Sequence, residues 1–228
     1  MQVNNDFSQR VVMRPSDYRF VASPLAGVSR MMLDRAGAEV ARATSIVRYA
    51  AGAGYTSHRH DGGEEIFVLE GIFSDEHGDY PVGTYLRNPP GSSHQPFSRE
   101  GCTLLVKLWQ FAADDTTQLV KQTASASWYQ GMVPGLSVLP LHEHDGINTA
   151  LVRWGPNTQF NPHTHPGGEE ILVLEGLFCD EHGEYPAGSW LRNPRYSTHS
   201  PFTREEGALI YVKTGHLGAN LLGDRFIE

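Results

Sequence analysis

The sequence predicts an all-β protein built from two tandem barrels or jelly rolls, and two observations carry this prediction. The first is a long internal repeat, because residues 58–99 align with residues 163–204 without a gap and two thirds of the aligned positions are identical. A unit of this length exceeds the roughly 20–50 residues of a solenoid repeat, so it indicates a duplicated domain. The second is a series of short segments that are typical of strands.

The predicted strands are short runs rich in β-branched and aromatic residues, each bounded by Gly, Pro, Asp or Asn. The clearest four span residues 65–70, 84–87, 103–109 and 208–213. Residues 75–81, like their copy at 180–186, contain the acidic residues and the glycine of a hairpin turn. Short strands joined by such turns, in two equal halves, favour barrels or jelly rolls.

Only residues 31–47 show a weak helical pattern. Their aligned copy contains Pro140 and Gly146, which disfavour a helix interior, so no helix is expected there. Residues 112–127 begin with a polar and acidic stretch, and we expect them to link the two halves. The expected domains are therefore residues 1–111 and residues 112–228, each long enough to bury a core of its own.

The charge balance argues against several classes of partner. Lys and Arg number 18 against 26 Asp and Glu, the formal net charge is −8, and no basic run occurs. Binding to nucleic acid or to an anionic membrane is therefore not expected. The first residues lack the layout of a signal peptide and no apolar run approaches roughly 18 residues, so we expect a soluble cytoplasmic protein. Cys102 and Cys179 occupy non-equivalent places in the repeat, which argues against a disulfide or a thiolate metal site.

Each copy of the repeat contains the same motif of histidines and glutamates. Residues 58–65 read HRHDGGEE, residues 163–170 read HTHPGGEE, and each stretch is followed at the same distance by a further histidine, His94 or His199. Neutral imidazole nitrogens and a carboxylate oxygen are the ligands expected around Zn, Fe, Mn, Ni or Cu. An H-x-H spacing puts two imidazoles on one face of a strand, because side chains alternate with a period of two. The sequence thus predicts one divalent metal ion per domain, with Zn or Fe favoured.

The pattern around these residues resembles the two motifs of the cupin superfamily. The matching residues are Gly52-x5-His58-x-His60-x3-Glu64-x6-Gly71 and Gly83-x5-Pro89-x-Gly91-x2-His94. The wider text, HRHDGGEEIFVLEG and DEHGDYPVGTYLRNPPGSSH, is similar to the cupin domain of ChrR-type anti-sigma factors. The likeness covers most of both halves and implies a bicupin, with two tandem double-stranded β-helix (jelly-roll) barrels.

The resemblance also implies the metal ligands, which are three histidines and one glutamate in each barrel. They are His58, His60, Glu64 and His94 in the first barrel, and His163, His165, Glu169 and His199 in the second. The repeat supports this set separately, since a third of the aligned positions have diverged and none of these eight has.

Two residues depart from the motif, because Asn157 and Tyr196 stand where it has glycine. Asn tolerates a left-handed backbone better than Tyr does. We therefore expect the second site to differ in the shape of its rim, with Tyr196 covering the entrance.

The number of protein ligands separates two functions. Four ligands leave two positions open on an octahedral ion and none on a tetrahedral one. ChrR-type proteins use their cupin domain for regulation, so the resemblance favours a metal-dependent sensory, regulatory or small-molecule-binding protein. The alternative is a non-heme metal dioxygenase that acts on a small diketone or hydroxyaryl ketone.

The partner we expect is a small molecule. Direct sigma-factor binding is not expected, because the first repeat already begins near Val11 and the H-x3-C-x2-C pattern of the separate zinc domain does not occur. A homo-oligomer is compatible with either function.

The interior of each barrel is expected to be mostly apolar. The residues concerned are Ile66, Val68, Phe73 and Tyr85, with their copies Ile171, Val173, Phe178 and Trp190. Such a lining favours an aromatic or diketone-like ligand over a sugar phosphate, which requires cationic groups. The other polar candidates are expected to be turn histidines (His77, His182), arginines paired with acids (Arg87, Arg192), carboxylates at the surface or between strands (Glu65, Glu170) and loop histidines (His142, His144).

Overall fold

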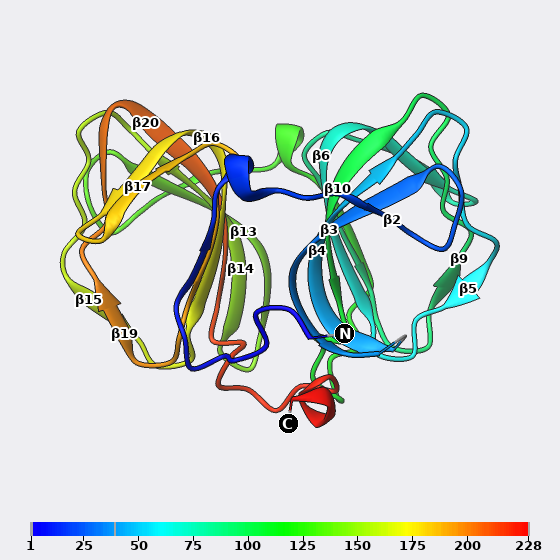
Figure 1. Cartoon of the computed structure of the whole chain (residues 1–228). Helices are drawn as coiled ribbons and strands as arrows, with labels where there is room; N and C mark the ends of the chain where they lie inside the picture. Colours follow the sequence, from blue (N-terminus) through cyan, green and yellow to red (C-terminus); the bar gives the residue numbers. More distant parts are fainter. Residues whose placement is uncertain (1, 39, 228) are drawn as a thin grey trace. The chain divides into compact units, whose positions relative to one another are not determined.

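The computed structural model describes residues 2–38 and 40–227, which form two compact all-β units (Figure 1). The first unit contains the described residues of 2–5, 19–125 and 220–227, and the second contains residues 6–18 and 126–219. Helical structure in the described chain is limited to three 3-10 turns, η1 (Pro15–Asp17), η2 (Thr123–Ser125) and η3 (Asp224–Phe226). None of the described helices could cross a bilayer. The predicted all-β class is therefore confirmed.

The first unit is organised around one large antiparallel sheet with the strand order β11-β8-β6-β10-β4-β3-β2. Strand β7 extends the sheet by pairing with β6, and the short pair β5-β9 lies apart from it. The bounds are β2 (Val21–Ala22), β3 (Val28–Gly37), β4 (Ala41–Tyr49), β5 (His58–Arg59), β6 (Glu64–Asp75), β7 (Gly78–Pro81), β8 (Thr84–Asn88), β9 (Ser93–His94), β10 (Cys102–Leu108) and β11 (Leu119–Gln122). The described residues of 31–47 thus lie in strands β3 and β4 and their connection, which agrees with the expectation that no helix forms there.

The second unit repeats this arrangement, with the order β1-β18-β16-β20-β14-β13-β12, an extension by β17 and a separate pair β15-β19. The bounds are β1 (Val11–Met13), β12 (Tyr129–Gln130), β13 (Leu136–His144), β14 (Ile147–Trp154), β15 (His163–His165), β16 (Glu169–Asp180), β17 (Gly183–Pro186), β18 (Trp190–Asn193), β19 (Ser197–His199) and β20 (Phe202–Thr214). His142 and His144 therefore lie on a strand, and their predicted place in a loop is wrong.

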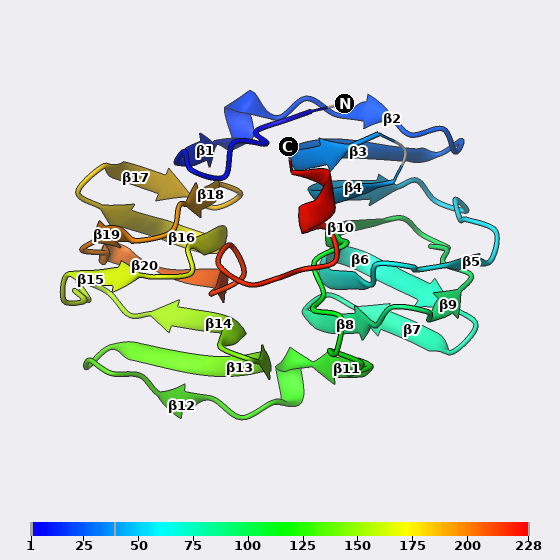
Figure 2. The same ribbon diagram turned by 90° about the horizontal axis from the view of Figure 1, so that it is seen from below.

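The first strand of each repeat pairs with the sheet of the other repeat (Figure 2). Strand β1 aligns with β18 so that Val11 lies opposite Arg192, and β11 aligns with β8 so that Leu119 lies opposite Arg87. The segment expected to be only a linker therefore contains a sheet strand. Its four residues alternate between half-buried and exposed, which is typical of an edge strand and too short a signal to stand out in the sequence.

Side chains alternate between the two faces of the sheet, and this alternation determines which residues form the core of the first unit. Ile66 and Val68 of β6, together with Leu104 of β10, belong to a buried apolar cluster on one face of the sheet. Glu65 points to the opposite face, as expected, and is only 2% exposed, so of the two predicted places, at the surface or between strands, it takes the second. Its cross-strand partner is the buried Arg87, which offers a cation to this carboxylate.

The second unit buries the equivalent glutamate in the same way. Glu170 lies opposite the buried Arg192 and accepts hydrogen bonds from Trp190 Nε1 at 2.8 Å and, with the ring nitrogen as donor, from His216 Nε2 at 3.2 Å. A buried carboxylate with such partners needs no solvent, so both glutamates are inter-strand polar groups, one of the two places predicted for them.

Candidate metal centre

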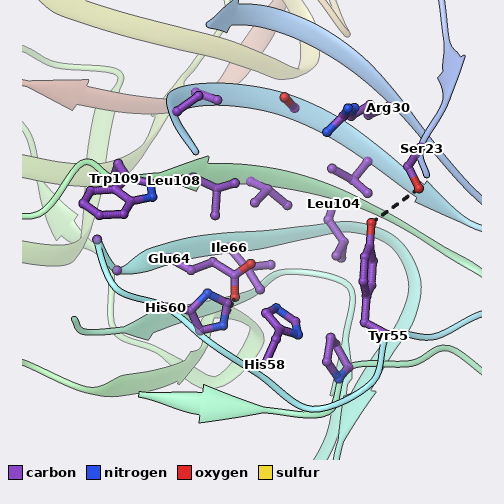
Figure 3. A pocket seen from close by; sticks show the side chains of 18 of the residues that line it. Ser23, Arg30, Tyr55, His58, His60, Glu64, Ile66, Leu104, Leu108 and Trp109 are labelled. Carbon is purple, nitrogen blue, oxygen red and sulfur yellow. Dashed lines mark hydrogen bonds and ion pairs between the residues drawn. The ribbon is translucent and has the colours of Figure 1, made fainter. Parts of the chain in front are cut away.

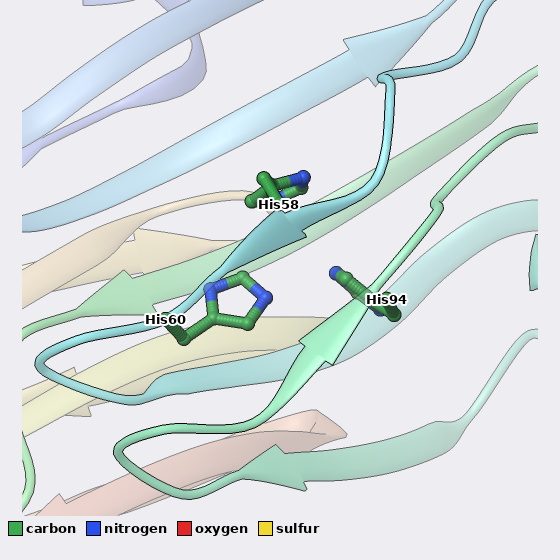
Figure 4. A group of neighbouring side chains, drawn as sticks. All are labelled: His58, His60 and His94. Carbon is green, nitrogen blue, oxygen red and sulfur yellow. The ribbon is translucent and has the colours of Figure 1, made fainter.

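The pair β5-β9 brings the three histidines of the first unit together (Figure 4). His58 lies directly opposite His94 across the two strands, and His60 follows two residues after His58. One ring nitrogen from each of the three lies within 4.8 Å of the other two. Nitrogens grouped at this spacing can bind a single ion that enters between them.

Glu64 completes this cluster from the start of β6. Its Oε2 lies 3.3 Å from Nε2 of His60 and 3.4 Å from Nε2 of His94. The side-chain amide of Asn88 donates to the same oxygen at 3.1 Å and so fixes the carboxylate. The candidate group is therefore three histidines, and Glu64 lies beside two of them.

The second unit builds the same cluster. His163 lies opposite His199 on the pair β15-β19, and Nε2 of His165 is 3.0 Å from Nε2 of His199. Glu169 lies 3.4 Å from His165 and 3.5 Å from His199, and Asn193 donates to its carboxylate at 2.9 Å. Each domain thus contains one candidate site of three histidines with a glutamate beside them.

The first cluster fits a metal ion because its inward nitrogens are left unsatisfied. Nε2 of His60 and Nε2 of His94 are buried and make no well-aligned hydrogen bond. Burial lowers the pKa of His60, and it also lowers the pKa of His165 in the second unit. Neutral imidazoles with free inward nitrogens are the form that binds a cation, so the residues present suit a divalent metal.

Contacts on the outer side of the rings orient them. Nδ1 of His58 lies 3.1 Å from the carbonyl oxygen of Thr56, and Nδ1 of His163 lies 3.0 Å from that of Asn161. A carbonyl can only accept, so these contacts place a proton on Nδ1 and leave Nε2 of each ring for the metal. Sequence reasoning did not identify these backbone partners, because any residue type can supply a carbonyl.

The aspartates that follow the ligand strands differ between the units. Asp75 lies 3.3 Å from Nδ1 of His94, whereas Asp180 lies 3.8 Å from Nδ1 of His199. Arg10 donates to Asp180 at 2.8 Å. Although burial raises the pKa of Asp180, the hydrogen bonds and the charge of Arg10 outweigh burial and lower it overall. In the sequence both aspartates belong to predicted turns, and nothing there indicates that they contact the outer ring nitrogens of His94 and His199.

A cavity of about 310 Å³ opens beside the first cluster (Figure 3). His58, His60, Glu64 and His94 form part of its wall. Of the expected interior residues, Ile66 and Phe73 line it, but Val68 and Tyr85 do not. Arginines also line it, Arg30 among them, so the expectation of a lining without cations is wrong for this barrel.

The rim residues of the second site take the backbone of the glycines they replace, as expected for Asn157. Asn157 and Tyr196 both adopt left-handed backbone, with φ of 51° and 62°, where the first repeat has Gly52 and Gly91. Tyr196 is 67% exposed, so its side chain lies largely in solvent.

The structural roles expected of the other polar residues are partly met. Arg87 donates to Asp115 at 2.5 Å, which confirms the predicted pairing with an acid. Arg192 lies opposite Glu170 across the strands and over the ring of Phe7. The turn histidines have half or more of their side chains exposed, as expected (His77, His182).

Solved structures with the same fold have low sequence identity. A candidate dioxygenase from Nostoc punctiforme aligns at 16% identity and a TM-score of 0.71, covering 98% of this chain and 86% of that one. Oxalate decarboxylase from Lactobacillus farciminis aligns at 13% and 0.65, covering 95% and 90%. The bacterial pirin YhhW from Escherichia coli, in complex with nickel(II), aligns at 14% and 0.65, covering 90% and 99%. No curated protein matches the chain.

The sequence itself matches a family twice. The ChrR cupin-like domain matches residues 8–112 and again residues 116–218. These two matches cover nearly the whole chain, and the two units each have the corresponding barrel sheet and histidine cluster. The chain therefore belongs to the ChrR cupin-like family and is a bicupin with two such domains in tandem.

Proposed function

We propose that each barrel binds one divalent metal ion through its three histidines and its glutamate, and that the first barrel binds a small molecule at that ion. In this proposal the protein is a metal-dependent sensory or ligand-binding protein. A sigma factor is not required as a partner. Zinc and iron are the ions that suit a site of three imidazoles and one carboxylate best.

One observation carries the proposal, namely that the four ligand residues of the first barrel form part of the wall of a cavity. A purely structural metal site is normally closed by protein on all sides. Here a molecule in the cavity would lie against the cluster, with Ile66, Phe73 and Leu104 providing apolar contacts. A cavity with an apolar wall and a few polar groups is the usual form of a small-molecule site.

The same cavity supports a second candidate, a non-heme metal dioxygenase. Its apolar wall would exclude water from a bound diketone or hydroxyaryl ketone, and iron would supply the oxygen chemistry. The residues of this chain would then hold and orient the substrate against the ion. Both candidates share the binding step and differ only in turnover.

Metal analysis and oxygen uptake separate the two functions. Protein purified without chelators is analysed for zinc and iron, and oxygen consumption is then followed with pentane-2,4-dione and 2-hydroxyacetophenone. Stoichiometric zinc without oxygen uptake supports the ligand-binding protein. Iron with sustained uptake supports the dioxygenase. A chain that binds neither metal would contradict both.

A further inference from the structure

The cavity of the first barrel contains a cation that no protein carboxylate neutralises. Val28 and Arg30 follow each other at the period of two on β3, and both line the cavity. Nε of Arg30 is buried without a hydrogen-bond partner, and Arg30 forms no ion pair within the described chain. Arg30 is half-buried, and a guanidinium whose Nε is buried without a partner is suited to bind an anion supplied from outside.

Two residues with hydroxyl groups, Ser23 and Tyr55, line the same cavity as Arg30. The Tyr55 hydroxyl lies 3.5 Å from Oγ of Ser23, which is a long and weak contact. Figure 3 shows Ser23, Arg30 and Tyr55 at one end of the cavity, with His60 and Glu64 towards the other and Ile66 between the two groups. We call Ser23, Arg30 and Tyr55 the polar end of the cavity.

The second repeat has lost every member of the polar end. Strand register makes the comparison unambiguous, since Arg30 lies opposite Val21 on β2 and Val138 lies opposite Tyr129 on β12. The residues at the equivalent positions are Gly131, Val138 and Phe160. All metal-ligand candidates are retained in both repeats, so the change concerns what is bound next to the metal and not the metal itself.

We infer that the ligand of the first barrel is a small carboxylate. Its carboxylate group binds Arg30 with help from the Tyr55 hydroxyl, and an oxygen at its other end faces the metal cluster. A guanidinium forms its best hydrogen bonds to such a planar anion.

This inference rests on the proposed function, because the ligand needs a metal in the first barrel. The test uses protein loaded with cobalt(II) and emptied at the second site by His163→Ala with His165→Ala. The probes are pyruvate and butane-2,3-dione, which have the same number of non-hydrogen atoms and differ in charge. Calorimetry gives each Kd, and the visible absorption of cobalt shows whether the probe reaches the metal.

The decisive variant is Arg30→Gln. We expect it to weaken pyruvate binding about 10- to 100-fold, the value of a charge-assisted hydrogen bond, and to leave dione binding and cobalt content unchanged. Tyr55→Phe installs the residue of the second repeat at little risk to folding, and we expect it to weaken pyruvate about 3- to 10-fold. Arg48→Gln is the matched control, because Arg48 is exposed on the neighbouring strand β4 and contacts the ring of Phe20.

The outcomes distinguish the two levels of the argument. Failure of the protein to take up cobalt contradicts the proposed function. Retention of cobalt without binding of either probe contradicts ligand binding at the metal, and the inference with it. Equal losses for both probes in Arg30→Gln, or no loss in either Arg30→Gln or Tyr55→Phe, would overturn the carboxylate assignment alone. Tighter binding of inorganic phosphate than of pyruvate would do the same.

Discussion

The two barrels have the same metal-ligand candidates but different surroundings. Each has three histidines within 4.8 Å of one another, a nearby glutamate and an asparagine that donates to that glutamate. Around this common centre, the first barrel has Arg30 in its interior where the second has Val138. The comparison teaches that duplication retained the groups suited to an ion while the groups suited to a ligand diverged.

The second difference lies on the outer side of the histidines. Among the described residues, Asp75 has His94 alone within ion-pairing distance, whereas Asp180 also pairs with Arg10. Arg10 precedes β1, and the register of β11 puts Gln118 at the equivalent place in the first unit. The carboxylate charge is therefore directed at the histidine in the first barrel and shared with an arginine in the second.

The largest expected effect is the loss of the metal ion from one barrel while the other barrel keeps its own. His58→Ala combined with His60→Ala should lower the metal content from two ions per chain to one, because it removes half of the ligand set. His163→Ala combined with His165→Ala should do the same through the other barrel. Elemental analysis of purified protein measures the content. A chain that retains two ions in either double variant would show that these histidines are not ligands.

A smaller effect is expected from the aspartates. Asp75→Asn should weaken metal binding in the first barrel about 10- to 100-fold, the usual effect of removing a carboxylate behind a ligating histidine. Asp180→Asn should have less effect on the second barrel, because Asp180 is farther from its histidine and is paired with Arg10. Competition with a chromophoric chelator gives both affinities. A larger loss of affinity in Asp180→Asn than in Asp75→Asn would contradict the difference described between the two barrels.

Acid should destabilise the metal-loaded protein. Burial lowers the pKa of His60 and of His165, so these two groups take up protons at a higher pH in the unfolded chain than in the folded one, and their contribution to stability is lost as pH drops below about 6.5. His199, whose pKa is raised, acts in the opposite direction. Protons also compete with the metal, and each tenfold loss of affinity removes about 1.4 kcal/mol of stabilisation from a metal in excess. Melting curves from pH 8 to pH 5 should fall more steeply with metal than with a chelator. Parallel curves would contradict ligation.

The smallest effect is expected at the rim. Tyr196 has a left-handed backbone that costs a residue with a side chain about 1–2 kcal/mol, and Tyr196→Gly would remove this cost while adding entropy to the unfolded chain. The net change in the free energy of unfolding should stay within about 1 kcal/mol. Because the side chain is mostly exposed, azide binding at the second site should change little. A large gain in azide affinity would show that Tyr196 covers the entrance after all.

Much of the fold and the candidate ligands could be predicted from the sequence, because the repeat and the histidine spacing are local patterns. Arg30 could not be assigned to the cavity, since a shift of one residue in strand register would have pointed it to the other face. For Glu65 and Glu170 the sequence left open whether they lie at the surface or between strands, because their buried partners come from other segments, which single-residue polarity does not reveal. Strand β11 escaped notice because four residues at a sheet edge carry little signal.

The exchange of first strands means that the repeat in the gene is not the unit that folds. A cut between residues 114 and 115 would give two fragments, each carrying a strand that completes the other's sheet and each lacking one of its own. The unpaired edges of β8 and β18 would then be free to recruit the missing strand from a second polypeptide. We expect such fragments to bind each other as the two halves of a split protein. A protein with a single repeat could complete its sheet in the same way, by exchanging its first strand with a second copy of itself.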